Sequence, residues 1–288
     1  MLSSNLIFTY WDQGWERVPA VVKLCKLSLE LHHPDATVHF LDSESVQDWI
    51  EFPLIDEEKW TQLPLPHRSD LIRTALLIKY GGVWVDPTVW FSRPMTQWLE
   101  KRSDAGLFLF SNPGRDRIIA NWFIASSKEN PIMCKLYSEL IEYWNVNDFK
   151  SIGHNDRRAI GLLSRILNRN NTLPQIWFRN SVIRLFNHAP YLVYHYMFAR
   201  IVASDGALYK AFSGMPKVSA DGPHTLLRLG LNNPASLDID RLIDRSEIPL
   251  FKLNWRTSNR VPDDSVLIKL QERTQQLTST FHHIKGTT

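Results

Sequence analysis

The sequence has few of the residues that mark disulfide-rich, zinc-binding or membrane-spanning proteins. Cys25 and Cys134 are the only cysteines in 288 residues, and their spacing fits no zinc motif. Two isolated thiols give no disulfide framework and indicate a reducing compartment, so we expect a cytoplasmic protein. No stretch reaches the roughly 18 apolar residues of a spanning helix, and residues 1–10 lack the regions of a secretory signal.

A strong excess of charge is also absent. The 33 basic and 30 acidic residues leave a net charge of +3, which does not favour nucleic acid as a partner. This modest excess and the eleven tryptophans are compatible with peripheral association at the anionic inner face of a plasma membrane, where a lipid-linked sugar acceptor would lie. At 44% hydrophobic residues, the chain can bury the core of one large domain.

Segments typical of strands and helices alternate along the chain, which predicts an α/β fold. The pattern loosens between residues 145 and 190, where we expect a helical insert that binds the acceptor. A helix over residues 262–280 is expected to close the fold. The other expected strands are 6–11, 37–41, 106–110, 122–125 and 248–253; the other expected helices are 20–31, 45–50, 159–167 and one opened by Asn130 and Pro131, with a loop at 53–66.

The most informative segment is HRSDLIRTALLIKYGGVWVDPTVWFSRPM, residues 67–95. Ser69 is the expected N-cap of a helix, with Asp70 in its first turn, and the glycine pair 81–82 is expected to end that helix. A strand over residues 83–85 should then stop near Asp86, because Pro87 cannot donate a backbone hydrogen bond. Ligands of open α/β sheets bind outside the carboxyl ends of strands, so Asp86 is a candidate ligand for a metal ion or a diphosphate.

The helical repeat separates an apolar face from a second face, which we expect to carry the functional residues. The apolar face is Leu71, Ile72, Ala75 and Leu76; the other is Asp70, Arg73, Thr74 and Leu77. A simpler interpretation is that Asp70 and Arg73 form a surface ion pair worth ~0.2–1 kcal/mol, while Asp86 accepts backbone hydrogen bonds in a turn. The pattern alone leaves both interpretations open.

The string S-D-x-x-R, followed by A-L-L-x-K-Y-G-G-V-W-x-D, resembles the signature of the bacterial capsular polysaccharide synthesis protein family. That family is similar to sugar transferases with a DXD motif, including the fungal initiation-specific α-mannosyltransferase and the clostridial glucosylating toxins. Further blocks resemble the family in the family's order, at residues 7–19, 111–126, 129–144, 191–198 and 249–256.

The resemblance implies one domain, residues 1–288, with the Rossmann-like GT-A fold of glycosyltransferases. This is an α/β fold whose mixed, mainly parallel central sheet carries helices on both faces. The implied activity is the transfer of a hexose, with retention of configuration, from a nucleotide-sugar donor to a capsular or cell-surface polysaccharide intermediate. A UDP-sugar is the favoured donor, and the acceptor would be a glycan or a lipid-linked sugar.

The resemblance also assigns roles to the donor-binding residues. Asp70 and Arg73 are implied to hold hydroxyl groups of the ribose or the sugar. Tyr10 and Trp11 match an aromatic pair that can stack on the nucleobase. Trp84 matches an aromatic residue whose polar edge faces the donor.

Asp86, Arg73 and Lys252 are the implied catalytic residues. Asp86 matches the first acid of the DXD motif. The family's lysine at position 252 could neutralise the leaving diphosphate, although a solvated surface lysine is the simpler interpretation.

The chain departs from the full DXD pattern because Thr88 replaces the second acid. Mg²⁺ commonly uses only one or two carboxylates together with substrate phosphates, so Mn²⁺ or Mg²⁺ bound by Asp86 is still expected. His195 lies in an aromatic run typical of a core histidine, and His224 lies in a turn-rich stretch. The spacing does not choose a further ligand among His195, His224, Asp205 and Asp221.

Two other functions compete with this transferase. Thr88 is compatible with a catalytically degenerate protein that only binds a nucleotide-sugar or carbohydrate. A toxin-like transferase that glycosylates a host protein ranks last, because such proteins normally bring delivery segments.

Overall fold

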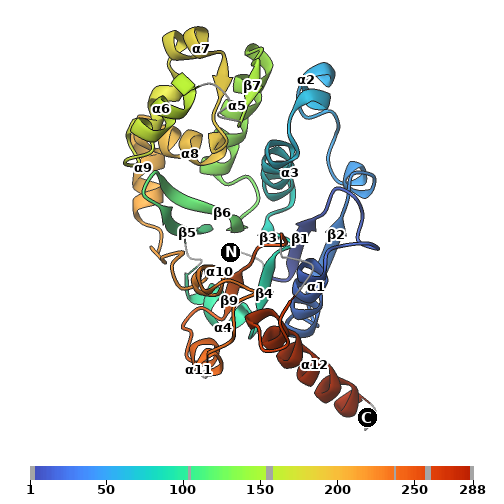
Figure 1. Cartoon of the computed structure of the whole chain (residues 1–288). Helices are drawn as coiled ribbons and strands as arrows, with labels where there is room; N and C mark the ends of the chain where they lie inside the picture. Colours follow the sequence, from blue (N-terminus) through green and yellow to red (C-terminus); the bar gives the residue numbers. More distant parts are fainter. Residues whose placement is uncertain (1–3, 103–104, 154–157, 237, 257–260, 286–288) are drawn as a thin grey trace. The chain divides into compact units, whose positions relative to one another are not determined.

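The computed structural model describes residues 4–102, 105–153, 158–236, 238–256 and 261–285, with side chains up to residue 279. The chain divides into two compact units. Unit 1 contains residues 44–84 and 102–219, and unit 2 contains residues 4–43, 85–101 and 220–288 (Figure 1). The single domain over residues 1–288 stays a prediction.

The main sheet has five strands in the order β2-β1-β3-β6-β5. β1 and β2 are parallel whereas β5 and β6 are antiparallel, so the sheet is mixed. The predicted α/β class with a mixed central sheet and flanking helices is confirmed. The strands are β1 (Leu6–Tyr10), β2 (Thr37–Leu41), β3 (Gly82–Val85), β5 (Leu107–Gly114) and β6 (Arg117–Ser126).

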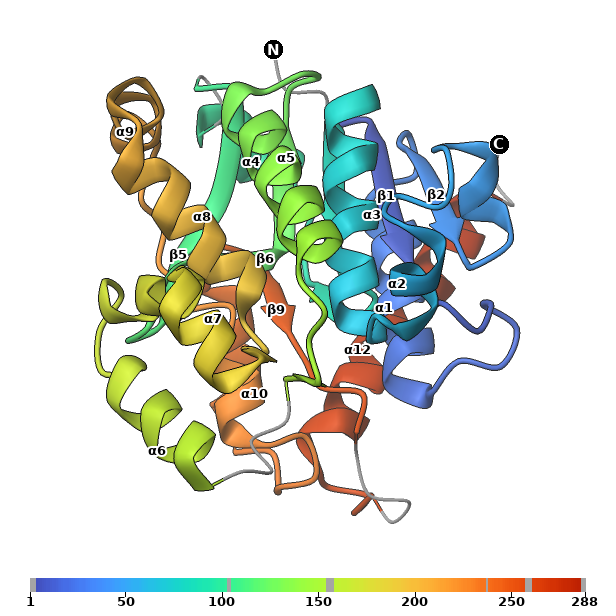
Figure 2. The same ribbon diagram turned by 90° about the horizontal axis from the view of Figure 1, so that it is seen from above.

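Unit 1 is built around helix α3 (Leu65–Tyr80). Helices α3 and α8 (Val193–Ser204) both pack on β6 and on α5 (Pro131–Val146), and Figure 2 shows α3 and α5 side by side. The predicted cap of α5 is confirmed, since the Asn130 side chain accepts hydrogen bonds from the backbone of Ile132 and Met133. The smaller elements are η1 (Ser45–Asp48), α2 (Glu57–Gln62), β7 (Ser151–Ile152), α6 (Arg158–Leu167), η3 (Leu173–Phe178), α7 (Asn180–Phe186), β8 (His188–Ala189) and α9 (Gly206–Ser213).

Helix α3 begins earlier than the sequence predicted. Its first residue is Leu65, so Ser69 lies inside the helix rather than at its N-cap. Pro66 stands in the first turn, where a proline costs no hydrogen bond. The expected loop at 53–66 also contains α2, which Asp56 caps by accepting hydrogen bonds from two backbone amides. A proline fits the first turn of a helix as well as a loop, so the prolines of this stretch do not distinguish the two.

The expected division of α3 into an apolar face and an exposed working face is wrong. Every residue from Asp70 to Leu77 is buried, so the middle of the helix is enclosed on all sides. The reason is that α5, α8 and β6 all pack against α3 within unit 1. Asp70 and Arg73 therefore belong to the interior of the unit, which excludes the surface ion pair considered as the simpler interpretation.

The glycine pair ends α3 as predicted. Gly81 and Gly82 have φ angles of +70° and +92°. A Cβ on Gly81 would lie 2.8 Å from the backbone nitrogen of Lys128, so this position needs glycine for conformation and for space. The next strand, β3, ends at Val85, and Asp86 follows at its carboxyl end as expected.

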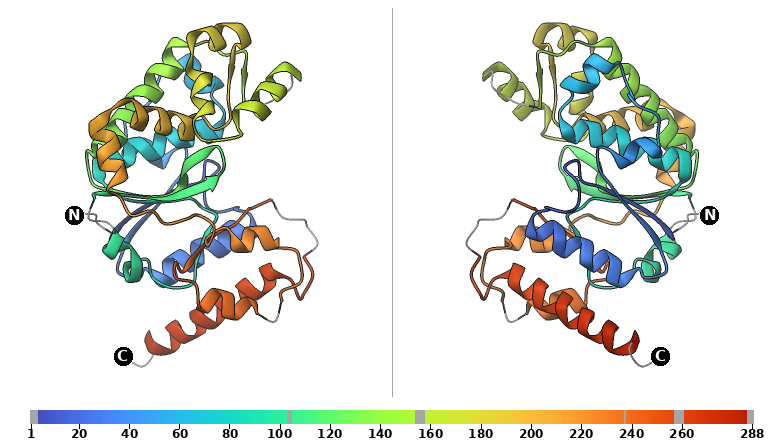
Figure 3. Two further views of the ribbon diagram at one scale, coloured as in Figure 1. Left: turned by 90° about the vertical axis from the view of Figure 1, so that its left-hand side faces the viewer. Right: turned by 90° about the vertical axis from the view of Figure 1, so that its right-hand side faces the viewer.

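In unit 2, α1 (Ala20–His32) packs on β4 (Val89–Phe91) and on α12 (Val266–Lys285), and Figure 3 shows α12 in red beside α1 in blue. Strand β4 pairs antiparallel with β9 (Leu250–Lys252). The predicted closing helix is observed as α12. The remaining helices are α4 (Thr96–Leu99), α10 (Thr225–Leu229) and α11 (Ile239–Asp244), with η2 (Glu100–Arg102) at the unit boundary.

Among the described residues, we find no helix with the length and apolar character needed to cross a bilayer.

Candidate functional site

Asp86 occupies the turn between strands β3 and β4. Its backbone oxygen accepts a hydrogen bond from the amide of Val89 at 3.0 Å, with Pro87 at the second position of the turn. The turn fixes the backbone, while the Asp86 side chain remains 20% exposed. The carboxylate is therefore not sealed in the interior, and it can meet a ligand.

Lys252 reaches Asp86 through strand pairing. In the antiparallel register of β4 and β9, Val89 lies opposite Lys252. The Lys252 ammonium lies 3.4 Å from Oδ2 of Asp86 and donates a hydrogen bond to the hydroxyl of Thr88. Lys252 is also only 19% exposed, so it is not the solvated surface lysine of the simpler interpretation.

Thr88 differs from Asp86 in its surroundings. It is 4% exposed, its backbone oxygen accepts a hydrogen bond from Leu253 at 2.8 Å, and its hydroxyl accepts one from Lys252. Thr88, which stands where the DXD motif has its second acid, thus holds Lys252 in place. We call Asp86, Thr88 and Lys252 the lysine group.

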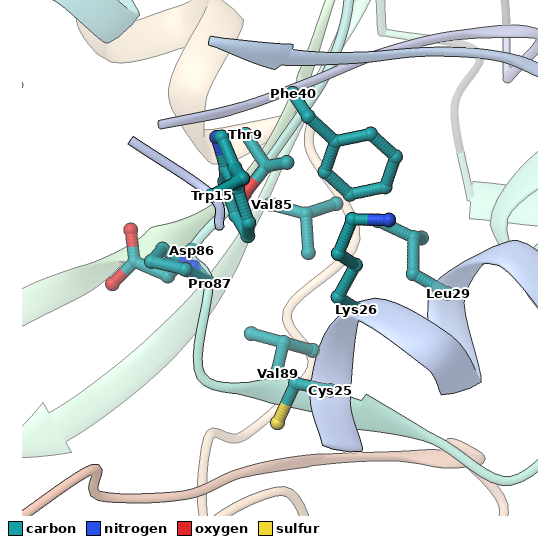
Figure 4. A pocket seen from close by; sticks show the side chains of 10 residues that line it. All are labelled: Thr9, Trp15, Cys25, Lys26, Leu29, Phe40, Val85, Asp86, Pro87 and Val89. Carbon is teal, nitrogen blue, oxygen red and sulfur yellow. The ribbon is translucent and has the colours of Figure 1, made fainter. Parts of the chain in front are cut away.

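A small hollow lies beside this turn (Figure 4). Its empty volume is about 180 Å³, which is below the ~300 Å³ at which ligand pockets usually begin. Figure 4 shows the Asp86 carboxylate directed away from Lys26 and Phe40, which line the opposite wall. A hollow of this size does not hold a whole nucleotide-sugar.

Unit 1 holds a second polar group, formed by Asp70, Arg73 and Asn121. The Asp70 carboxylate accepts a hydrogen bond from Nδ2 of Asn121 at 2.8 Å and lies 3.6 Å from the Arg73 guanidinium. Arg73 donates to the backbone oxygen of Asn121 at 2.5 Å and to the hydroxyl of Ser69 at 3.0 Å. We call this the α3 group; its charges are paired and held by several fixed contacts.

Trp84 supports the α3 group from β3. The Arg73 guanidinium lies 4.9 Å from the centre of the Trp84 ring, a distance at which a cation is attracted to the face of an aromatic ring. Trp84 itself is fully buried. The ring therefore packs against Arg73 inside unit 1, while the predicted contact with a donor stays a prediction.

Asn121 was missed by the sequence analysis, although its signal is visible. It lies in the otherwise apolar run Ile118–Ile124 of β6, and a polar residue in such a buried strand needs a partner. Only the position of α3 beside β6 shows that the partners are Asp70 and Arg73.

His67 lies one turn before Asp70 and is 2% exposed. Burial lowers its pKa to about 4, so the ring is neutral at pH 7. Its Nδ1 atom lies 4.0 Å from Asp70, and its ring packs on Trp144 with centroids 5.1 Å apart. His67 thus contributes packing rather than charge to the α3 group.

The two residues of the predicted base-stacking pair have different surroundings. Tyr10 is 6% exposed, and its hydroxyl donates to Asp12 at 2.6 Å, so this ring belongs to the core of unit 2. Trp11 makes an edge contact with Trp255, a residue that is 42% exposed. The sequence analysis missed Trp255, although it lies in the family-like block 249–256. Trp11 and Trp255 are the better candidates for stacking on a base.

The candidate metal ligands do not form a cluster. Within the described ranges, no group of three or more His, Cys, Asp or Glu side chains is arranged to hold a metal ion. His195 is buried, which lowers its pKa, and the charges of Arg117 and Arg73 lower it further; these cations disfavour another cation there. His224 is the N-cap residue of α10. Asp205 caps α9, and Asp221 forms an exposed ion pair with Arg228.

Comparison with known proteins identifies the family. Residues 2–151, more than half of the chain, match the model of the capsular polysaccharide synthesis protein family. Of the site residues, this match includes those of the α3 group and Asp86, but not Lys252 or Trp255.

Two individual proteins are also similar. The O-glycosyltransferase braB of Annulohypoxylon truncatum is 26% identical over 197 residues, which cover 60% of this chain and 46% of the relative. The chain thus spans about half the length of this curated relative. The solved structure of PaToxG glycosyltransferase is 15% identical with a TM-score of 0.36, covering 73% of this chain and 74% of the other. The family match confirms what the motif indicated: the chain belongs to the capsular polysaccharide synthesis protein family.

Proposed function

We propose that the protein is a glycosyltransferase that moves a hexose from a nucleotide-sugar, with a UDP-sugar favoured, to a capsular or cell-surface glycan or its lipid-linked intermediate. Family membership and the name of the curated relative support a transferase. The observation that carries the proposal is the lysine group, in which Lys252 is held by Asp86 and Thr88 at the carboxyl end of β3.

The lysine group suits the most difficult part of this reaction. Breaking the bond between sugar and phosphate places negative charge on the departing diphosphate and positive character on the sugar carbon. A positioned ammonium group stabilises the diphosphate as the bond breaks, with no reorganisation when it is already held in place. In this proposal Lys252 acts on the leaving group, and Asp86 and Thr88 position it.

The family resemblance also implies contacts between Asp70 and Arg73 and the sugar or ribose hydroxyls, for which a carboxylate and a guanidinium offer acceptors and donors. Because both side chains are buried and paired within unit 1, that role stays a prediction. Trp11 and Trp255 provide aromatic surface for the base. Retention of configuration is part of the proposal and is decided by the stereochemistry of the product.

The residues present do not fit a resident metal ion well. Asp86 offers one carboxylate, the hydroxyl of Thr88 is engaged by Lys252, and Lys252 brings a positive charge within 3.4 Å of that carboxylate. A divalent ion beside Asp86 would have to displace this ammonium or bear its repulsion. We therefore assign no step to a metal, and the Mn²⁺ or Mg²⁺ expected from the motif, which is untested, is not part of this proposal.

The test is nucleotide release from a panel of UDP-, GDP- and CDP-sugars, with Mn²⁺ or with EDTA. We expect one donor to be consumed, and we expect activity to persist in EDTA. Loss of all turnover in EDTA, restored by Mn²⁺, would contradict the assignment of the leaving-group charge to Lys252 alone. No consumption of any donor, with or without acceptor glycans, would refute the transferase.

The degenerate binder is the second candidate, because Thr88 is paired with Lys252 instead of offering a carboxylate. It predicts a donor that binds in calorimetry and is never cleaved. The same panel therefore separates the two functions.

A further inference from the structure

The basic residues are unevenly distributed along the chain, which the small net charge does not reveal. Residues 158–204 contain six arginines and no aspartate or glutamate. This segment carries +6 while the whole chain carries +3, so the rest of the chain carries −3. Five of these arginines are exposed, namely Arg158, Arg165, Arg169, Arg179 and Arg184.

Helix α6 places apolar side chains in solvent next to two of these arginines. Ile160 and Leu167 are buried, and the helix packs on η3. Leu162 is 58% exposed and Ile166 is 39% exposed. They lie four residues apart, so they form one strip along the helix.

The polar side of α6 completes an amphipathic helix. At 100° per residue, Arg158 and Arg165 project within about 60° of Leu162. The exposed apolar strip is therefore bordered by guanidinium groups on one edge and by the buried side of the helix on the other.

Helix α7 repeats this combination. Leu185 is 74% exposed, and its neighbour Arg184 and the cap residue Arg179 are exposed too. Both α6 and α7 pack on η3 in unit 1. Helices α6 and α7 thus carry three exposed apolar side chains, namely Leu162, Ile166 and Leu185, with exposed arginines beside them.

We propose that the exposed side chains of α6 and α7, namely Leu162, Ile166 and Leu185 with Arg158, Arg165 and Arg184, bind the surface of an anionic phospholipid bilayer. The arginines would contact lipid phosphates, and the leucine and isoleucine side chains would enter the boundary between headgroups and acyl chains. A soluble acidic polymer would satisfy only the arginines, because it offers no apolar environment for the exposed strip. The inference does not depend on the proposed catalysis.

The experiment is vesicle flotation of the whole protein with phosphatidylcholine vesicles and with vesicles that also contain phosphatidylglycerol. We expect binding only to the anionic vesicles. The double variant Arg158→Gln/Arg165→Gln should bind about 30-fold more weakly, which corresponds to roughly fivefold per arginine near the surface. The variant Leu162→Ser/Ile166→Ser, with unchanged charge, should lose about tenfold or more.

Matched controls test whether the location matters. Lys23→Gln/Arg245→Gln removes the same charge from exposed positions of unit 2, and Leu229→Ser/Leu277→Ser removes exposed apolar side chains there. These controls should bind as the unchanged protein does. Circular dichroism of each variant checks that the fold is retained.

Three results would overturn the proposal. The first is no retention on anionic vesicles even at low salt. The second is that the control pairs weaken binding as much as the α6 pairs. The third is that the apolar variant binds normally while a soluble polyuronate competes fully, which would indicate an acidic glycan instead. Because vesicle binding requires no turnover, none of these results bears on the proposed transferase activity.

Discussion

The α3 group and the lysine group both contain an acid and a base, but they are built in opposite ways. Asp70 and Arg73 are 8% and 5% exposed and have several fixed partners, whereas the side chains of Asp86 and Lys252 are about one fifth exposed. Removing one partner from a buried ion pair leaves an unpaired charge in the interior, which costs several kcal/mol of stability. Removing one partner from a partly hydrated pair costs little, because water solvates the remaining charge. The α3 group should therefore contribute mainly to stability, and the lysine group mainly to chemistry.

The largest expected effect is on stability in unit 1. Asp70→Ala leaves the Arg73 guanidinium buried without its carboxylate, so we expect the free energy of unfolding to fall by about 3–5 kcal/mol. Urea denaturation measures this change. Lys26→Ala is the matched control, since it breaks an exposed pair with Glu30 and should cost at most about 1 kcal/mol. Equal losses in the two variants would contradict the comparison.

The next effect is on activity in unit 2. Lys252→Met should lower turnover of the nucleotide-sugar by about 10²–10³-fold. Removing one hydrogen-bond donor that stabilises a developing anion has an effect of this size in other enzymes. The free energy of unfolding should change by no more than about 1 kcal/mol. Lys252→Arg keeps the charge and should recover part of the turnover. A loss of stability as large as that of Asp70→Ala would show that the lysine group is structural.

Acid should destabilise both units. His67 in unit 1 and His32 in unit 2 each have a pKa of about 4, lowered by burial from 6.5. The unfolded chain therefore takes up protons first, and stability present above pH 6.5 is lost as the pH falls towards 4. Between pH 7 and pH 5 each histidine should cost about 2 kcal/mol.

Single variants separate the contributions of the two histidines. His67→Gln and His32→Gln should each reduce the loss of unfolding free energy between pH 7 and pH 5 by about 2 kcal/mol, while His195 and His33, whose pKa values burial also lowers, keep their own contributions. A variant that left the pH dependence unchanged would contradict the assignment of that histidine.

The smallest effect concerns a part of unit 1 outside the α3 group. Asn130→Ala removes the cap of α5, so we expect a loss of about 1 kcal/mol in unfolding free energy. Turnover per folded molecule should not change. A drop in turnover comparable with that of Lys252→Met would mean that activity is sensitive to any loosening of unit 1.

Much of the secondary structure could be predicted because local signals decide it. The strands β1 and β2, helix α1, the cap at Asn130 and the glycine stop at 81–82 all follow from residues within a few positions. The start of α3 was wrong because Pro66 favours a helix N-terminus as much as a loop. The burial of Asp70 and Arg73 was missed because it depends on α5, α8 and β6 packing around α3, which periodicity within α3 does not reveal.

The candidate site was predicted in part for the same reason. Asp86 follows from the strand and the proline beside it, and Lys252 from its family-like block, but their contact depends on the register of β4 and β9. Asn121 and Trp255 each needed a partner distant in sequence to be recognised. The roles assigned to all these residues remain predictions for experiment.

The pairing of β4 with β9 has a consequence for the order of events during synthesis. The lysine and the threonine that it contacts are separated by 164 residues, and β9 follows most of unit 1 in the chain. While the ribosome is still making the middle of the protein, Asp86 and Thr88 have already emerged without the ammonium that Lys252 later brings. Any translation product that stops before residue 250 would lack this cation, so the chain acquires its proposed reactive charge only after the whole of unit 1 has been made.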